Sequence, residues 1–248
     1  MSRPNPAAAP LAAEQREPTK AFLWIYVLAY FGGWLGILGP AILALYTRLA
    51  DLFPPAGQGT TAVSALAVVS GVGAVAATLA NPFIGRLSDR TTSRFGMRTP
   101  WLIISSVIFV LGSLVVAFGP ANIAVVTIGW SLSQVGFNGM LAIFTAVLPD
   151  QIPERMMGRV SSVLGIAMNV ASLAAVWLVG LFAAGTITFD DAGVITGGDP
   201  SSPLRFIVPV AVAVATSMIL VVALRPIDRH IQRSQVPPYS VGEFFGSF

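Results

Sequence analysis

The stretch Gly85-Arg86-Leu87-Ser88-Asp89-Arg90-Thr91-Thr92-Ser93-Arg94-Phe95-Gly96-Met97-Arg98-Thr99-Pro100-Trp101 is strongly basic, with four arginines and a single aspartate. The runs on either side of it, residues 60–84 and 101–118, are apolar and carry no charged residue. A lipid bilayer explains this contrast, because about 20 consecutive apolar residues cross it as a helix while a basic loop stays in the cytoplasm. The stretch therefore predicts two membrane-spanning helices joined by a cytoplasmic loop.

The composition of the 248-residue chain extends this prediction to its whole length. Hydrophobic residues make up 55% and charged residues 10%, whereas a soluble domain carries about 25% charged residues. The predicted fold class is an all-α membrane protein with six transmembrane helices in a domain at 21–225. The predicted spans are 22–47, 60–84, 100–118, 121–147, 159–183 and 204–225. We expect residues 1–20 to form a disordered cytoplasmic tail and residues 226–248 to begin a cytoplasmic linker.

The distribution of basic residues predicts the orientation. Of the 14 lysines and arginines, only Arg48 and Arg205 fall on one side of the predicted spans, and all others fall on the side of both termini. The positive-inside rule therefore places both termini in the cytoplasm, and we expect the plasma membrane as the location. The pI near 9.8 then reflects topology, so the expected partner is the lipid bilayer and no nucleic acid.

The sequence offers little for an enzyme. It has no cysteine, its single histidine, His230, lies in a polar segment, and its 11 acidic residues fall outside the apolar parts of the spans. Nucleophilic and metal-assisted chemistry both need clusters of such residues. We therefore expect no enzymatic activity, cofactor or metal, and we assign no coupling ion.

Two spans carry polar and aromatic residues on one helical face. Tyr26, Tyr30 and Trp34 recur at a spacing of four in the first span, and Gln134 and Asn138 do so in the fourth. Tyr30, Trp34, Gln134 and Asn138 are the candidates for the wall of a substrate cavity. Packing between helices through interhelical hydrogen bonds is the alternative for the two amides. Tyr26 also fits an anchor at the membrane interface.

Small residues form a stripe at helical spacing along the second span. Such a stripe lets another helix approach closely, so we interpret it as a packing surface and not as a ligand site. The third and sixth spans are more uniformly apolar and suit lipid-facing positions. The stripe consists of Ser64, Ala67, Gly71, Ala74 and Thr78.

The basic stretch also resembles a known family. Gly85, Asp89 and Arg90, followed by Gly96 and Arg98, are similar to the signature loop between the second and third helices of major facilitator superfamily transporters. The version Ser-Asp-Arg-Thr, Ser-Arg-x-Gly-x-Arg and Pro-Trp most resembles the glycoside–pentoside–hexuronide:cation symporter branch. The segment 148–161 also resembles a Pro-Asp…Pro…Arg-Gly…Ser loop of these transporters, although Met157 stands where they have arginine.

The resemblance implies a fold and a function. It implies two inverted three-helix repeats, with the first and fourth helices lining a cavity for a small polar solute such as a sugar or glycoside. Gly85, Asp89, Arg90 and Arg98 would then form a latch that holds the cytoplasmic ends of the transporter closed and releases them during alternating access. The four cavity candidates fall on the helices that this scheme requires.

The family's fold has twelve helices, and this chain supplies six. We expect it to act as the N-terminal half of a split transporter that needs a second six-helix half. Two alternatives remain open: a homodimer of two such halves, and a membrane protein that interacts with a partner without transporting a solute.

Overall fold

The computed structural model describes residues 17–53, 61–184 and 203–228. All regular elements in these ranges are helices, and no strand occurs among them, which confirms the predicted all-α fold class. In chain order they are α1 (Lys20–Gly39), the π-helical turn η1 (Pro40–Ala44), α2 (Leu45–Leu52), α3 (Ala62–Asp89), α4 (Thr99–Phe118), α5 (Ile123–Gln151), α6 (Glu154–Ala184) and α7 (Leu204–Leu224).

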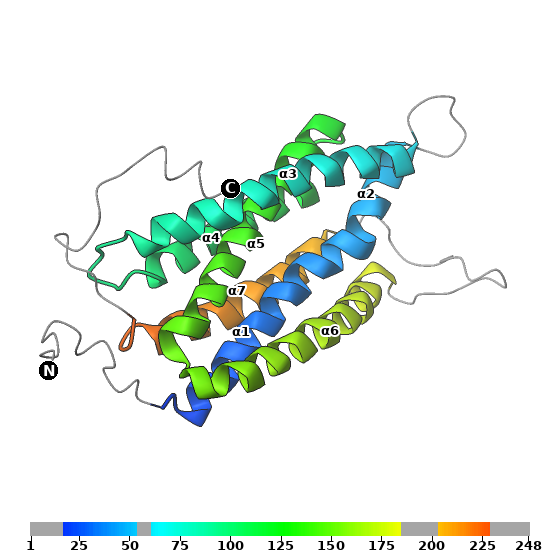
Figure 1. Cartoon of the computed structure of the whole chain (residues 1–248). Coiled ribbons are helices and arrows are strands. Elements are labelled where there is room, and N and C mark those ends of the chain that lie inside the picture. Colours follow the sequence, from blue (N-terminus) through cyan, green and yellow to red (C-terminus); the bar gives the residue numbers. More distant parts are fainter. Residues whose placement is uncertain (1–16, 54–60, 185–202, 229–248) are drawn as a thin grey trace, which may run out of the picture.

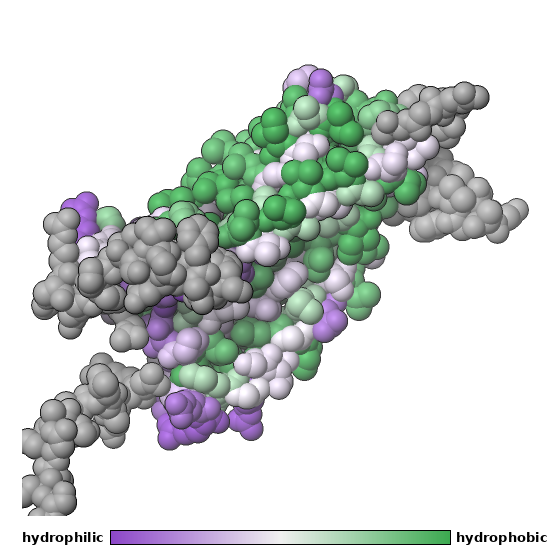
Figure 2. Space-filling view, turned by 45° about the horizontal axis from the view of Figure 1, so that its top comes forward, coloured by the Kyte–Doolittle hydropathy of each residue, from purple (hydrophilic) through white to green (hydrophobic). Residues whose placement is uncertain are grey.

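Six helical segments are long and apolar enough to cross a membrane. The first combines α1, η1 and most of α2, and the other five are α3, α4, α5, α6 and α7. Each predicted span corresponds to one of these segments. In the space-filling view, hydrophobic residues cover most of the described body and hydrophilic residues gather at its ends (Figure 2). The chain is therefore a multi-pass membrane protein.

Several helices extend beyond the predicted spans at the end that carries the basic stretch. α3 continues through Pro82 to Asp89, and only Ile152 and Pro153 separate α5 from α6. The predicted spans end at 84 and 147 and begin at 159, so the helices continue beyond the predicted spans at these points. Hydropathy detects the part of a helix that lies in lipid, whereas backbone hydrogen bonds carry the helix on into water.

The first span is interrupted at Pro40. Pro40 begins the π-helical turn η1, at the end of which the Leu45 N–H donates a hydrogen bond to the Pro40 carbonyl. Proline has no N–H to donate and crowds the preceding turn, so the helix widens locally. The short helix α2 that follows is held by Leu45 and Leu49, which are completely buried.

The helices form two layers. α3 contacts α5, α5 contacts α1, and α1 contacts α6, so these four form a row with α3 and α6 at its two sides (Figure 1). α4 packs against α5, α7 packs against α1, and α4 and α7 contact each other behind the row. One broad side of the row therefore has no helix of the described chain in front of it. We term this side the open face.

The two triplets of spans pack in the same way. The first triplet is α1–η1–α2, α3 and α4, and the second is α5, α6 and α7. Exchanging the triplets converts the contact α1–α7 into α5–α4 and the contact α1–α6 into α5–α3, while α4–α7 is unchanged. Equivalent helices run in opposite directions because three crossings separate them. This is the packing pattern of two inverted three-helix repeats.

Glycines allow the closest of these contacts. A Cβ atom on Gly36 of α1 would lie 2.5 Å from the Ala213 Cβ of α7, and one on Gly136 of α5 would lie 2.3 Å from the Phe109 backbone nitrogen of α4. No hydrophobic force drives helices together in lipid, so close backbone approach and van der Waals contact supply the attraction. The layers are thus joined by backbone-to-backbone packing.

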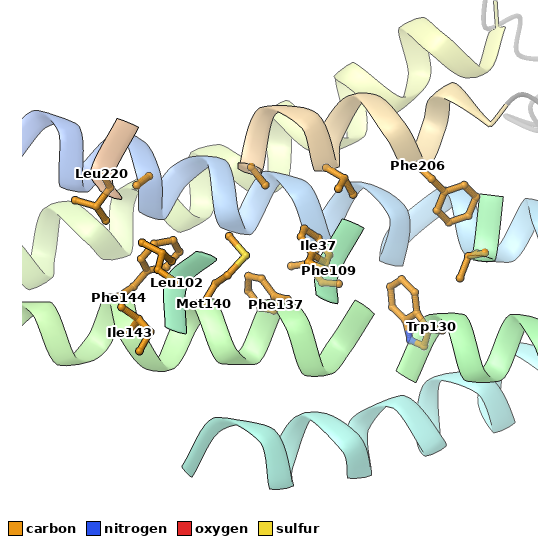
Figure 3. Close-up of a cluster of buried hydrophobic side chains, with 14 of the residues drawn as sticks. Ile37, Leu102, Phe109, Trp130, Phe137, Met140, Ile143, Phe144, Phe206 and Leu220 are labelled. Carbon is orange, nitrogen blue, oxygen red and sulfur yellow. The ribbon is translucent and has the colours of Figure 1, made fainter. Parts of the chain in front are cut away.

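A hydrophobic cluster fills the space between the layers. Phe109 of α4 and Phe137 of α5 lie with ring centroids 6.3 Å apart, and Ile37 of α1 lies beside them (Figure 3). The side chains on the outside are also apolar: Leu111 of α4 is 51% exposed and Val222 of α7 is 68% exposed. The space between the layers is therefore apolar, and the layer of α4 and α7 has an apolar, lipid-compatible exterior.

Substituting Gly136→Ala should destabilise the bundle by about 1–3 kcal/mol, because the added methyl group meets backbone atoms that cannot move aside. The matched control is Gly158→Ala, since nothing lies within 4 Å of a Cβ at Gly158. That control should be neutral or stabilising by up to about 1 kcal/mol through helix propensity. Unfolding of the detergent-solubilised protein by denaturant measures both changes. Equal stability of the two variants would contradict the packing described for Gly136.

Candidate functional site

Arg98 occupies the centre of a charge cluster at one end of the bundle. Its side chain is 7% exposed, its Nη1 lies 2.6 Å from Asp89 Oδ1, and its Nε lies 2.7 Å from Asp150 Oδ2. Nη1 also donates to the Ser88 hydroxyl at 3.1 Å. The guanidinium thus binds the last turn of α3 and the last turn of α5 at once, with one N–H group directed to each carboxylate.

Asp228 fastens the backbone of the same arginine. Its carboxylate accepts the Arg98 N–H at 3.0 Å and the Thr99 N–H at 2.9 Å, and Asp228 is 5% exposed. Arg98 and Thr99 form the start of α4, which has no capping side chain of its own. A carboxylate at a helix N-terminus pairs with free N–H groups and with the positive end of the helix dipole. Asp228 therefore caps α4 from beyond the end of α7.

A glycine shapes the backbone that carries Arg98 into this position. Gly96 has φ of 89°, a conformation that disfavours residues with a side chain. A Cβ there would also lie 2.2 Å from the Asp228 carboxylate. The Ser88 hydroxyl donates to the Met97 carbonyl in the same connection. The turn between α3 and α4 is thus closed tightly enough for Arg98 to point inward.

The structure unites two of the four predicted latch residues directly, Asp89 and Arg98. Arg90 forms the C-cap of α3. Gly85 lies in α3, and a Cβ there would meet only Ala142 at 3.9 Å, an ordinary contact, so no close approach requires glycine at this position. Sequence analysis missed Asp228, whose one signal was an acid amid the basic residues that follow the last span.

Asp150 was also missed as a member of the cluster, although it stands in the second motif-like segment. Its side chain is 9% exposed, whereas that of Asp89 is 56% exposed. A charge pair with little solvent contact is screened less, so the Arg98–Asp150 pair contributes more than the Arg98–Asp89 pair. The two carboxylates therefore have different roles: Asp150 is a fixed partner, and Asp89 is a partner that water can replace.

A polar stripe lies at bilayer depth on the uncovered side of α5. Because α3, α1 and α4 cover the other sides of α5, these side chains face the open face. They follow one another at spacings of three, four and seven, and none of these residues is buried as a whole. The Ser131 hydroxyl alone is enclosed, and it has no hydrogen-bond partner among the described residues. A polar group in a span must meet protein or water rather than lipid. The stripe consists of Thr127, Ser131, Gln134, Asn138 and Thr145.

The amides of this stripe retain hydrogen-bonding capacity. Asn138 Nδ2 donates to the Gln134 carbonyl at 2.9 Å, which leaves the side-chain oxygen of Asn138 as an acceptor. Within the described ranges the Gln134 amide has no hydrogen-bond partner, and its Cγ lies close to Gly73 of α3. An amide group supplies both donors and acceptors, as hydroxyl-rich solutes require. Neither amide side chain forms a hydrogen bond to another helix within the described residues.

Aromatic residues of α1 lie next to this stripe. The Tyr30 ring centroid is 6.0 Å from that of Phe144, and the Trp34 centroid is 5.1 Å from that of Phe137. The enclosed indole N–H of Trp34 has no hydrogen-bond partner among the described residues. Tyr26 is completely buried, and its hydroxyl donates to the Phe144 carbonyl at 2.6 Å. The expectation of an interfacial anchor at Tyr26 was wrong, because its polar group is satisfied inside the protein.

The helices at the two sides of the row are the least covered. All five residues of the small-residue stripe on α3 are exposed, and nothing lies within 4 Å of a Cβ at Gly71. On α6, Asn169 is exposed and Gly165 likewise has no atom within 4 Å of a Cβ. The predicted packing surface on α3 therefore has no partner within the described chain.

A groove of about 670 Å³ lies at the Arg98 end, between the start of α1 and the ends of α5 and α7. Phe22, Ile25, Asp150 and Ile227 are among the residues that line it. None of the four predicted cavity residues does. Among the described residues, no group of three or more histidine, aspartate or glutamate side chains is placed to hold a metal ion.

Comparison with protein-family models finds no match for this chain, and comparison with curated proteins finds none.

Replacing Asp150 with asparagine should cost about 1–3 kcal/mol, because a nearly buried guanidinium loses one charged hydrogen-bond partner. Replacing Asp89 with asparagine should cost at most about 1 kcal/mol, since that carboxylate is largely in water. Denaturant unfolding of the two variants in the same detergent provides the comparison. A larger loss for Asp89→Asn than for Asp150→Asn would reverse the roles assigned to the two carboxylates.

Proposed function

We propose that this chain is one six-helix half of a major facilitator-type secondary transporter and moves a small polar solute by alternating access with a second six-helix body. The observation that carries the proposal is the open face. It combines hydrogen-bonding side chains and aromatic rings at bilayer depth, between two helices with uncovered small residues. A transporter needs its solute site near the bilayer midplane between two such bodies.

The chemistry of the open face favours an uncharged solute. Gln134 and Asn138 offer donors and acceptors, and Tyr30 and Trp34 offer rings on which the apolar face of a sugar can stack. No charged residue of the described ranges lies in the middle of a span. A sugar or glycoside fits this combination of neutral polar groups and aromatic surface. This solute class also agrees with the family that the basic stretch resembles.

The distribution of charge favours an orientation with both termini in the cytoplasm of a cell whose plasma membrane holds the protein. The Arg98 cluster then lies on the cytoplasmic side. There, the side chain of Asp89 is half exposed. Of the two carboxylates that bind Arg98, it can most easily leave Arg98 and bind a group on the second body instead. Arg90 and Gly85 flank it in the same last turns of α3. We assign these residues to a latch that is made and broken as the two bodies rock.

The uncovered stripe on α3 supports assembly with a partner. Substituting Gly71→Leu places a bulky side chain on that stripe and should abolish the complex in native membranes. Leu111→Ala on the lipid-facing side of α4 is the matched control and should leave it intact. Chemical cross-linking followed by mass spectrometry measures both variants and identifies the partner. A second six-helix chain fits the split transporter, whereas a copy of this chain fits the homodimer.

Transport itself is tested with the assembled complex in proteoliposomes and a panel of labelled neutral sugars. Asn138→Leu should reduce uptake at least about tenfold, the effect of losing one hydrogen bond with a bound solute, without changing assembly. Asp89→Asn should slow exchange while insertion into the membrane stays normal. A wild-type complex that assembles but moves none of these solutes would favour the alternative, an interaction protein without transport.

A further inference from the structure

A second buried arginine lies at the end of the bundle opposite Arg98. Arg205 is the second residue of α7 and is 1% exposed, and it is the largest fully buried side chain of the described ranges. Its Nη1 donates to the hydroxyl of Thr47 in α2. A guanidinium costs much free energy to bury, so its place is fixed by what it binds.

Thr47 connects this arginine to the interruption of the first span. Its hydroxyl donates to the Ala44 carbonyl at 2.9 Å and lies 3.3 Å from the Leu43 carbonyl. Leu43 and Ala44 belong to the π-helical turn η1, where the regular hydrogen-bond pattern is broken. A chain of hydrogen bonds therefore runs from Arg205 through Thr47 to the turn that separates α2 from α1.

Arg48, the next residue of α2, makes a contact of the same kind. Its Nη2 donates to the Gly119 carbonyl at 2.8 Å, and Gly119 is the C-cap of α4. A cation at a helix C-terminus pairs with free carbonyls and with the negative end of the helix dipole. The two basic residues at this end of the bundle thus turn inward and fasten α2 to α7 and to α4.

The inverted repeats make Arg205 the counterpart of Arg98. Arg98 stands at the start of α4, the third span of the first triplet, and reaches the last turn of α5 at Asp150. Arg205 stands at the start of α7, the third span of the second triplet, and reaches α2, which ends the span equivalent to α5. The two arginines therefore lie near the starts of equivalent helices and at opposite ends of the bundle.

We propose that Arg205 is the positioning residue of a second latch, which holds α2 against α7 at the end opposite Arg98 and lets α2 swing on η1 when the contact breaks. The proposal rests on the alternating-access function proposed above, because alternating access requires the two ends to open in turn. Thr47 is the residue through which Arg205 acts. The movement of α2 is small, since Leu45 and Leu49 anchor this two-turn helix to its neighbours.

The chain contains no cysteine, so single cysteines report on each end of the intact protein. Leu49→Cys reports on α2 and Ile152→Cys reports on the Arg98 end, and both positions are completely buried. In each reporter background the protein carries Arg205→Gln, Arg205→Lys, Thr47→Val or the pair Arg205→Gln/Thr47→Val. The rate of reaction with a charged maleimide in proteoliposomes measures the fraction of time that each end is open.

We expect Arg205→Gln to speed labelling of Leu49→Cys roughly tenfold, which corresponds to about 1.4 kcal/mol, and to leave Ile152→Cys unchanged. Thr47→Val keeps the shape of threonine and removes only the hydroxyl, so it should give a similar increase in a folded protein. The double variant should add little beyond Arg205→Gln, because both changes remove the same Arg205–Thr47 hydrogen bond. Arg205→Lys keeps a charged donor and should restore slow labelling in part.

Three results overturn the latch: unchanged labelling at Leu49→Cys in Arg205→Gln, equal increases at both reporters, or fully additive effects of Arg205→Gln and Thr47→Val. Equal increases mean general loosening of the fold. The sugar-uptake assay separates this proposal from the proposed function. If the protein shows no sugar uptake but the labelling results are as expected, the Arg205 contact stands and the transport function is refuted. If the protein transports sugar but the labelling results differ, only the latch is refuted.

Discussion

Lipid leaves a polar side chain two favourable surroundings, protein or water, and this constraint determines what the open face means. The stripe on α5 could have been covered by α4 or α1, as Tyr26 is by α5, but it lies on the side that no described helix covers. Its threonines bind carbonyls of their own helix, as Thr127 and Thr145 do, so lipid is tolerable for them. Gln134 has no such partner, and its amide is the group that most requires water, a solute or a second protein.

The same architecture follows from how helices attract one another in a bilayer. Glycines let α1 pack closely against α7 and α5 pack closely against α4, and these glycines are covered by the helix that they contact. The small-residue stripe on α3 remains exposed, and Gly165 of α6 has no atom within 4 Å of a Cβ, at the two sides of the row. Buried arginines then fasten the helix ends, with Arg98 at one end and Arg205 at the other. The result is a two-layer unit whose polar stripe lies on the open face and whose exposed small-residue stripe lies on α3 at its side.

Sequence analysis predicted the parts of this structure that depend on local chemistry. Apolar runs predicted the six spans, and helical spacing brought Gln134 and Asn138 to one face. It missed what depends on distant partners. Nothing near Asp228 indicates that it caps a helix 129 residues earlier, and nothing in the spacing of Tyr26 indicates that its hydroxyl reaches the Phe144 carbonyl. The predicted spans cover the apolar parts of the helices, and the helices themselves continue beyond them. The transport function remains a proposal.

The central claim is that the open face is lined by water or solute and not by lipid. The most direct measurement is the reactivity of a single cysteine at Asn138, in membranes that contain the assembled protein, towards a small charged thiol reagent, compared with a cysteine at Leu111 on the lipid-facing side of α4. The account predicts that the cysteine at 138 reacts readily and is protected by a transported solute, while the cysteine at 111 stays unreactive. Equal unreactivity at both positions would contradict it, because the stripe on α5 would then meet lipid or a dry protein interface.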